Sequence, residues 1–175
     1  LLVPLALGMV YPVLATWTKT NGLRPPDGLT LDGTAHLRQD NPGDAEAIAW
    51  MRSNLSDGIV AEAVSGSYSV GGRISAHTGL PTVLGWPGHE LQWRGGGEEM
   101  GSREQDIHDL YVTRDWDEAQ PILARYGIAY VYVGPLERIV YPDLFAVKFD
   151  AYLRPVYRSD SVTLYAVPAQ ELFEP

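Results

Sequence analysis

Hydrophobic residues are unevenly distributed along the chain, and the first stretch is the most uniformly apolar. Residues 1–17 contain no charged side chain, and the first charge is Lys19. At about 1.5 Å of rise per residue, a helix here would cover most of a bilayer core, so the stretch predicts the tail of a transmembrane helix. Two alternatives stay open: a signal peptide with small residues near 13–15, and a first strand or buried segment of the folded domain.

A polar segment follows this stretch. Residues 18–42 are rich in Gly, Pro, Asp and Asn, which favours a linker or an extended arm. Residues 41–44 are of the types that cap a helix and form its first turn. Ile48 and Met51 follow them at helical spacing. The pattern predicts a soluble domain over residues 43–175 that begins with a helix.

Five apolar runs in this domain have the length of β-strands. Residues 59–64 and 81–86 are short apolar runs bounded by Gly and Pro. Residues 128–133 (IAYVYV) form the clearest strand, because their side chains are β-branched or aromatic. Residues 153–159 and 162–167, joined by Asp-Ser, predict a terminal β-hairpin.

Further helices are predicted between these strands. Ser-x-x-Gln at residues 102–105 and Asp-x-x-Glu at residues 115–118 are capping boxes, each followed by an apolar stripe. Gly127 suits the end of the second helix, and Pro121 inside it predicts a late start or a kink. Residues 136–152 predict one or two short helices. The alternation predicts an α/β fold with a mixed, mainly parallel sheet covered by helices and a C-terminal β-hairpin.

Composition and charge exclude several classes of function. The net charge is −9 without a basic stripe, which argues against nucleic acid as a partner because phosphate binding needs clustered cations. The chain has no Cys, which excludes disulfides, thiolate metal sites and a cysteine nucleophile. No phosphate loop, dinucleotide fingerprint, nucleophile elbow or zinc spacing is present, so we expect no cofactor and no metal.

Unusual side chains concentrate between residues 62 and 94. Aromatic rings alternate there with Arg, His and carboxylates in a segment rich in Gly and Pro, as in loops that line a ligand crevice. Such a set suits a sugar or a phosphorylated head group. The candidate substrate-binding residues are Glu62, Tyr68, Arg73, Trp86, His89, Glu90, Trp93 and Arg94. The alternative is structural, with the tryptophans covering a sheet edge and the arginines paired with Glu62 and Glu90.

The same segment resembles a known family. Residues 72–95 (GRISAHTGLPTVLGWPGHELQWRG) resemble the C-terminal region of the YYY-signature multi-pass membrane proteins. These uncharacterised proteins are similar to glycosyltransferases that use lipid-linked sugars. Further matches in the same order extend over nearly the whole chain, including residues 11–16 (YPVLAT), 126–133 and 134–138 (GPLER). His77 departs from the pattern, since an aromatic or apolar residue is expected there.

The resemblance implies an extracytoplasmic domain that follows the last transmembrane helix of a protein in the cell membrane. It places the catalytic carboxylates in upstream membrane loops, so it transfers no catalytic residue to this chain. The partners that it implies are the membrane, through the upstream helices, and a polyprenyl-phosphate sugar or a glycan acceptor.

Three functions remain open at this point. An accessory or substrate-binding domain of a membrane glycosyltransferase-like protein predicts a concave face near Trp86, Trp93 and Arg94. A purely structural or partner-interaction domain that caps the membrane bundle predicts that the arginines are buried and paired. An independent carboxylate hydrolase predicts that Glu62 faces Glu90 or His89 across an open cleft about 5 to 9 Å wide.

Overall fold

The computed structural model describes residues 2–24, 28 and 30–168, and the chain divides into two units, Leu1–His36 and Leu37–Pro175. The first unit contains helix α1 (Leu2–Lys19), so the segment is helical rather than a strand. Its apolar side chains Tyr11 and Trp17 are exposed by 81% and 60%. Within the described residues, no helix combines the length and the apolar character that a membrane crossing requires.

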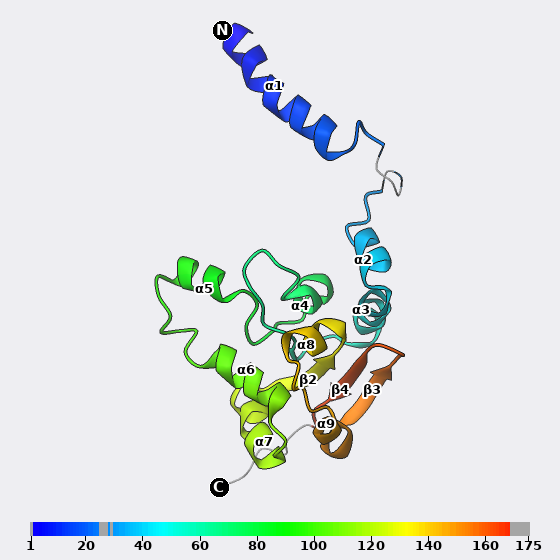
Figure 1. The fold of residues 1–175 in the computed structure, drawn as a ribbon, viewed down its shortest axis with the longest axis vertical. Helices are drawn as coiled ribbons and strands as arrows, with labels where there is room; N and C mark the ends of the chain where they lie inside the picture. Colours follow the sequence, from blue (N-terminus) through cyan, green and yellow to red (C-terminus); the bar gives the residue numbers. More distant parts are fainter. Residues whose placement is uncertain (1, 25–27, 29, 169–175) are drawn as a thin grey trace. The chain divides into compact units, whose positions relative to one another are not determined.

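The second unit is a sheet packed between helices (Figure 1). Its strands lie in the order β1-β2-β4-β3, with β1 parallel to β2 and the other two pairs antiparallel. The strands are β1 (Ile59–Ala61), β2 (Ile128–Val133), β3 (Arg154–Arg158) and β4 (Thr163–Ala166). The helices are α2 (Ala35–Asp40), α3 (Pro42–Asn54), α4 (Arg73–Thr78), α5 (Pro87–Arg94), α6 (Arg103–Val112), α7 (Trp116–Arg125), α8 (Pro135–Val140) and α9 (Val147–Tyr152).

Alternating strand residues divide the core between the two faces of the sheet, because successive side chains on a strand point to opposite sides. Val131 and Val133 of β2 belong to a core that also contains buried residues of α6, α7 and α9. Tyr132 between them belongs to a second core, with Met51 of α3 and Ile74 of α4. The sheet is therefore the middle layer of three.

The predicted mixed α/β sheet with a C-terminal hairpin is confirmed, and so are the helix after residues 41–44 and the strand at 128–133. The balance of strand pairings differs from the expected mainly parallel one, since only β1 and β2 pair in parallel. Two of the predicted strands are also reduced. One helix also lies inside the expected linker: α2 contributes the buried Leu37 to the second core.

Where the two reduced strands were predicted, side chains make hydrogen bonds that backbone groups would make in a regular strand pairing. In the run 59–64 the ladder stops at Ala61, because the N–H groups of Ala63 and Val64 donate to Glu137 and to the Tyr141 hydroxyl. The run 81–86 makes a single parallel bridge to Val60, where a side-chain hydroxyl supplies one of the hydrogen bonds. This run begins with a proline, which has no N–H to donate to a ladder.

The two predicted capping residues precede helices as expected, but only one of them makes a side-chain cap. Asp115 caps α7 and accepts the Asp117 N–H at 2.9 Å, and Gly127 follows the helix with a φ of 59°. Pro121 does not end the helix. Ser102 precedes α6 as predicted, but its hydroxyl donates to Asp106, so no capping box forms there.

Candidate functional site

The candidate site lies where the two parallel strands end. Parallel neighbours present their carboxyl ends at the same edge of a sheet, so the residues that follow β1 and β2 come together. Glu62 directly follows β1, and Gly134 with helix α8 directly follows β2. Asp44 of α3 and Arg73 of α4 complete a buried ion network, defined as Asp44, Glu62, Arg73 and Glu137. An exposed group of aromatic rings from α5 and the loops before it lies beside this network.

Arg73, the first residue of α4, is the centre of the ion network. Its Nε donates to Asp44 Oδ2 at 2.6 Å, and its Nη1 and Nη2 donate to Glu137 Oε1 and Oε2 at 3.2 and 3.1 Å. The Tyr132 hydroxyl donates to the other Asp44 oxygen at 2.7 Å, and the Arg73 Cζ lies 5.4 Å from the centre of the Tyr132 ring. Burial would lower the pKa of Arg73, but Glu137 and Asp44 outweigh it and raise that pKa above its ordinary value.

Glu62 holds the start of α4 in place. Its two carboxylate oxygens each accept a backbone N–H at 2.9 Å, one from Ile74 and one from Ser75. These are two of the first N–H groups of the helix, which have no partner within the helix itself. Arg73 Nη1 lies 3.9 Å from Glu62 Oε2. Burial raises the pKa of Glu62 to about 7, although the two N–H groups and Arg73 oppose the shift.

Glu137 joins the ends of the two strands. It accepts the Ala63 N–H and the Gly134 N–H, both at 2.9 Å, in addition to the two bonds from Arg73. Within the described residues every buried side-chain nitrogen or oxygen has a hydrogen-bond partner. The ion network is thus fully satisfied, as buried charges require, and it stabilises the turns that carry the site.

The aromatic cluster consists of Tyr68, Trp86, His89 and Trp93. Successive ring centres lie 5.3 Å apart for Tyr68 and Trp86, 5.7 Å for Trp86 and His89, and 5.8 Å for His89 and Trp93. Trp93 and Tyr68 are 75% and 78% exposed, while Trp86 is half-buried and donates its indole N–H to the Gly71 carbonyl at 2.7 Å. The Trp93 indole N–H donates to His89 Nε2 at 2.8 Å, which requires the neutral His89 tautomer with its proton on Nδ1.

A hollow of about 230 Å³ lies beside this cluster, between the start of α4 and the start of α5. Aromatic, hydroxyl, carboxylate and backbone groups line it together: Gly71, Gly72, Ser75, Ala76, Thr82, Gly85, Trp86, His89 and Glu90. Because Glu62 bonds the backbone of Ser75, the ion network supports one wall of the hollow.

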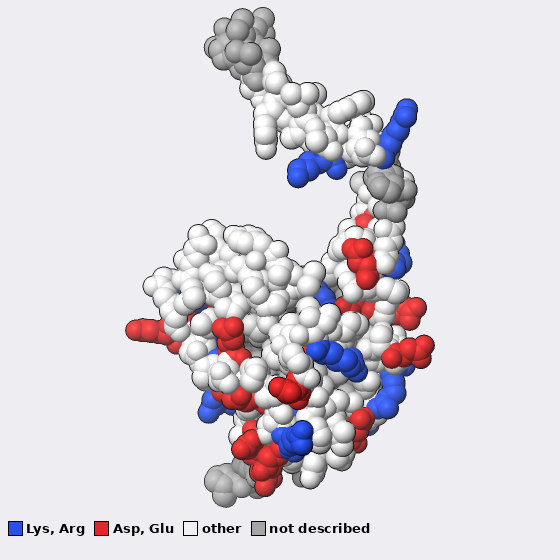
Figure 2. Space-filling model, viewed as in Figure 1, with Lys and Arg blue, Asp and Glu red and all other residues white. Residues whose placement is uncertain are grey.

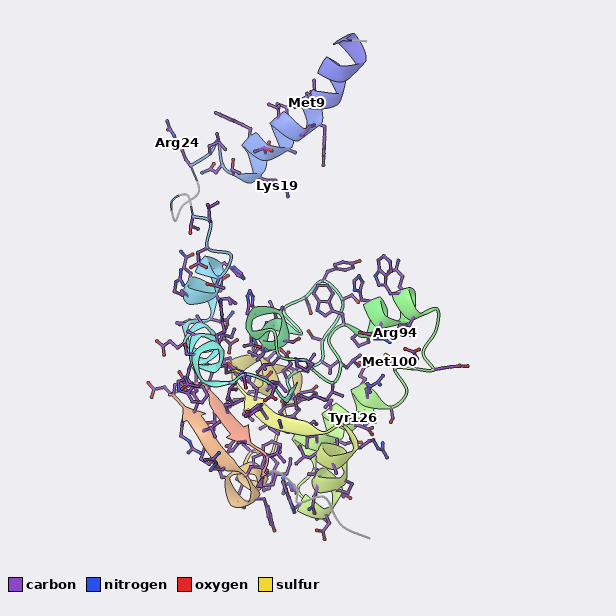
Figure 3. All side chains as sticks on the ribbon, turned by 180° about the vertical axis from the view of Figure 1, so that it is seen from behind. Met9, Lys19, Arg24, Arg94, Met100 and Tyr126 are labelled. Carbon is purple, nitrogen blue, oxygen red and sulfur yellow. The ribbon has the colours of Figure 1, made fainter. Side chains whose placement is uncertain are left out.

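Arg94, at the end of α5, differs from Arg73 in being exposed (Figure 3). Its side chain is 52% exposed and pairs with Glu90 one helical turn earlier and, at 2.5 Å, with Glu99. These two carboxylates raise the pKa of Arg94. Such exposed pairs contribute little to stability, because water screens them.

The structure thus separates the eight candidate residues into two groups. Glu62 and Arg73 lie in the ion network, whereas Tyr68, Trp86, His89, Glu90, Trp93 and Arg94 belong to the exposed surface around the hollow. The structural pairing predicted for the arginines, with Glu62 and with Glu90, is present for both. Sequence reasoning missed Asp44 and Glu137 as the main partners of Arg73.

One of the missed partners leaves a signal in the sequence. Asp44 precedes Ala47, Ile48 and Met51 by three, four and seven positions, and all four are buried on one face of α3. That spacing identifies Asp44 as an inward-facing charge that needs a partner.

The geometry does not suit carboxylate hydrolysis at Glu62. Glu62 is 1% exposed and both of its oxygens bind backbone N–H groups, so it does not face an open cleft as that mechanism requires. In the described part of the chain, no three His, Asp or Glu side chains are grouped as metal ligands would be.

Comparisons with known proteins add a structural likeness. No protein-family model matches the chain, and no curated protein matches it. Among solved structures, the chain is similar to the crystal structure of the C-terminal globular domain of an oligosaccharyltransferase from Archaeoglobus fulgidus. The identity is 13% and the TM-score 0.46, over 71% of this chain and 97% of that one.

Proposed function

We propose that this chain is the extracytoplasmic accessory domain of a multi-pass membrane glycosyltransferase-like protein, and that it binds substrate while upstream membrane loops carry out catalysis. The observation that carries the proposal is the exposed aromatic cluster beside a hollow whose wall rests on a fully satisfied ion network. A binding surface needs exposed rings that contact the ligand and a rigid support that holds these rings in position. The resemblance of residues 72–95 to the YYY-signature family supports the membrane context.

The hollow offers recognition rather than acid-base chemistry. The buried acid nearest to it, Glu62, is occupied by backbone N–H groups, and the exposed Glu90 is paired with Arg94. Binding of a glycan acceptor or of a polyprenyl-phosphate sugar in the hollow would therefore act by positioning the ligand for groups outside this chain.

A structural role is the second candidate, and the burial of Arg73 favours it. Arg73 is 5% exposed and binds side chains from α3 and α8, so it links α4 to these two helices. A domain that only caps a membrane bundle would need these contacts of Arg73 for its stability. It would make no use of the exposed Trp93.

A transfer assay on the full-length protein separates the two roles. In membranes supplied with a polyprenyl-phosphate sugar and an acceptor, we expect Trp93→Ala to lower kcat/KM by roughly tenfold, mainly through KM, because the ring contacts ligand before and during the reaction. Tyr152→Ala is the matched control, since Tyr152 is also exposed, by 55%, and stacks on Trp116 of α7. Arg94→Ala is expected to have a smaller effect. Unchanged transfer in both Trp93→Ala and Arg94→Ala would refute the substrate-binding role.

A further inference from the structure

The surface around the hollow offers little that would attract a phosphate group. Phosphate recognition relies on unpaired Arg or Lys, or on helix N-terminal N–H groups. Arg73 is buried among three carboxylates, and Arg94 is paired with Glu90 and Glu99. At the helix starts beside the hollow, Glu62 accepts the N–H groups of Ile74 and Ser75, and the Trp86 carbonyl accepts those of His89 and Glu90. Because the exposed charges nearest to the hollow include more carboxylates than cations, an anionic ligand would be repelled.

The rest of this surface is uncharged. Residues 63–89 contain a single charged residue, Arg73, which is buried, although the whole chain carries a net charge of −9. Figure 2 shows the result as a largely uncharged area over α4 and its flanking loops, whereas acidic and basic groups alternate over the lower part of the body. A ligand that matches this area carries no net charge.

The lining groups indicate which neutral ligand fits. Trp86 and His89 offer ring faces and edges, Ser75 and Thr82 offer hydroxyl groups, and Glu90 offers carboxylate oxygens that only accept hydrogen bonds. A pyranose ring has the complementary pattern, because its C–H faces are apolar and its rim consists of hydroxyl groups that both donate and accept. A hollow of about 230 Å³ holds one such ring.

We propose that the hollow beside Tyr68, Trp86, His89 and Trp93 binds a single neutral saccharide ring, and that it does not bind the phosphate of a lipid carrier. The saccharide stacks on the exposed rings and donates hydroxyl hydrogen bonds to Glu90. This inference deepens the proposed function and rests on it, since it assigns the ligand of the same surface: the sugar part of an acceptor or donor.

A lipid surface is the competing partner, because exposed Trp and Tyr also favour membrane interfaces. Glu90 argues against it. A carboxylate in the lining of the hollow gains from a hydroxyl donor, whereas burial of the same carboxylate against lipid would remove its water without supplying a donor.

The indole N–H signals of the 175-residue chain provide the test. The chain has five Trp, and each indole signal in a ¹H–¹⁵N spectrum can be assigned by a single Trp→Phe substitution. Titration with methyl α-mannoside, methyl β-glucoside and N-acetylglucosamine is expected to shift the Trp86 and Trp93 signals saturably for at least one sugar. Trp50, packed on Tyr157, and Trp116, stacked on Tyr152, are the internal controls.

Two variants establish that the shift arises from the hollow. Trp93→Ala is expected to weaken saccharide binding by roughly tenfold or more, because it removes a largely exposed stacking ring. Tyr152→Ala removes another exposed ring elsewhere and is expected to leave binding unchanged. Unshifted Trp50 and Trp116 signals in Trp93→Ala show that this variant is folded.

Other outcomes overturn the inference. It is refuted if inorganic pyrophosphate shifts Trp86 and Trp93 while the sugars do not. The same holds if phosphatidylcholine vesicles capture the chain in a manner that depends on Trp93 while the sugars have no effect, or if no probe acts. If the sugars fail here but Trp93→Ala still impairs transfer by the full-length protein, the substrate-binding role stands and only its ligand class is wrong.

Discussion

The same residue type has two different tasks in this site. Arg73 is 5% exposed and donates to two carboxylates, whereas the Arg94 side chain is 52% exposed and pairs at the surface. Removing one partner from a buried ionic group leaves the others unpaired out of contact with water, and this costs far more than the loss of a surface pair.

Stability measurements on two variants follow from this contrast. Arg73→Ala is expected to lower the free energy of unfolding by about 3 to 5 kcal/mol, because Asp44 and Glu137 would remain buried without their cation. Arg94→Ala is the control and is expected to leave the free energy of unfolding nearly unchanged. Urea denaturation followed by circular dichroism gives both values. Equal, small losses would show that the ion network contributes little.

Glu62 makes part of the stability depend on pH. Burial raises its pKa in the folded chain to about 7, from an ordinary value of 4.5. Between these two pH values the folded chain therefore binds more protons than the unfolded chain, so stability falls as pH rises. The contribution from a protonated Glu62 is fully present below pH 4.5 and is lost as the pH rises through 7.

Comparison with Glu62→Gln isolates this effect. Unfolding free energies from pH 4.5 to 7.5 are expected to fall more steeply in the unmodified chain than in Glu62→Gln, by a difference on the order of 3 kcal/mol across the window. The variant is expected to be less stable at low pH, because an amide offers only one oxygen to the N–H groups of Ile74 and Ser75. Parallel profiles for Glu62→Gln and the unmodified chain would contradict the assignment.

At the scale of elements, the sequence predicts those whose pattern is local and continuous. The strand at 128–133 and the helix stripe of Ile48 and Met51 are found where periodicity places them. The runs 59–64 and 81–86 look alike in sequence, yet the end of the first bonds to the distant side chains Glu137 and Tyr141. The second bonds to Val60 through its own Thr82 hydroxyl. Their extent as strands could not be deduced from local pattern alone.

The site shows the same division between local and long-range information. The segment 62–94 was identifiable as unusual because its rings and charges are close together in sequence. The partners of Arg73 were not identifiable, since Asp44 and Glu137 are 29 and 64 positions away. Ion pairs over such distances follow from the sheet topology, which brings the ends of β1 and β2 together.

The turn between β2 and α8 leaves no room for a side chain at Gly134. A Cβ added to Gly134 would lie 2.7 Å from the Tyr132 ring, 3.1 Å from Asp44 Oδ1 and 3.2 Å from Glu137 Oε2. Gly134→Ala is therefore expected to destabilise the chain by about 1 to 3 kcal/mol through overpacking of the ion network. Gly96→Ala is the control, because its added Cβ would meet no atom within 4 Å. Thermal unfolding of the two variants checks the difference, and equal midpoints would contradict it.

At the scale of the whole molecule, the second unit builds both hydrophobic cores from its own described residues. Every buried member of the two cores lies at Leu37 or later. In α1 the described apolar side chains are instead exposed, Tyr11 by 81% and Leu14 by 59%. An exposed apolar helix favours contact with a lipid phase over water. The sequence-based expectation that this segment is a membrane tail therefore remains a prediction with a direct physical test.

Deletion of residues 1–34 tests that prediction. The shortened chain keeps α2 and both cores, so its unfolding midpoint in urea and its near-ultraviolet circular dichroism are expected to match those of the whole chain. Binding to phosphatidylcholine vesicles, measured by co-sedimentation, is expected for the whole chain and lost on deletion, because α1 carries the exposed apolar area. Loss of the near-ultraviolet signal on deletion would mean that residues 1–34 take part in folding. Vesicle binding that survives deletion would place the lipid contact on the second unit and remove the reason to regard α1 as the membrane tail.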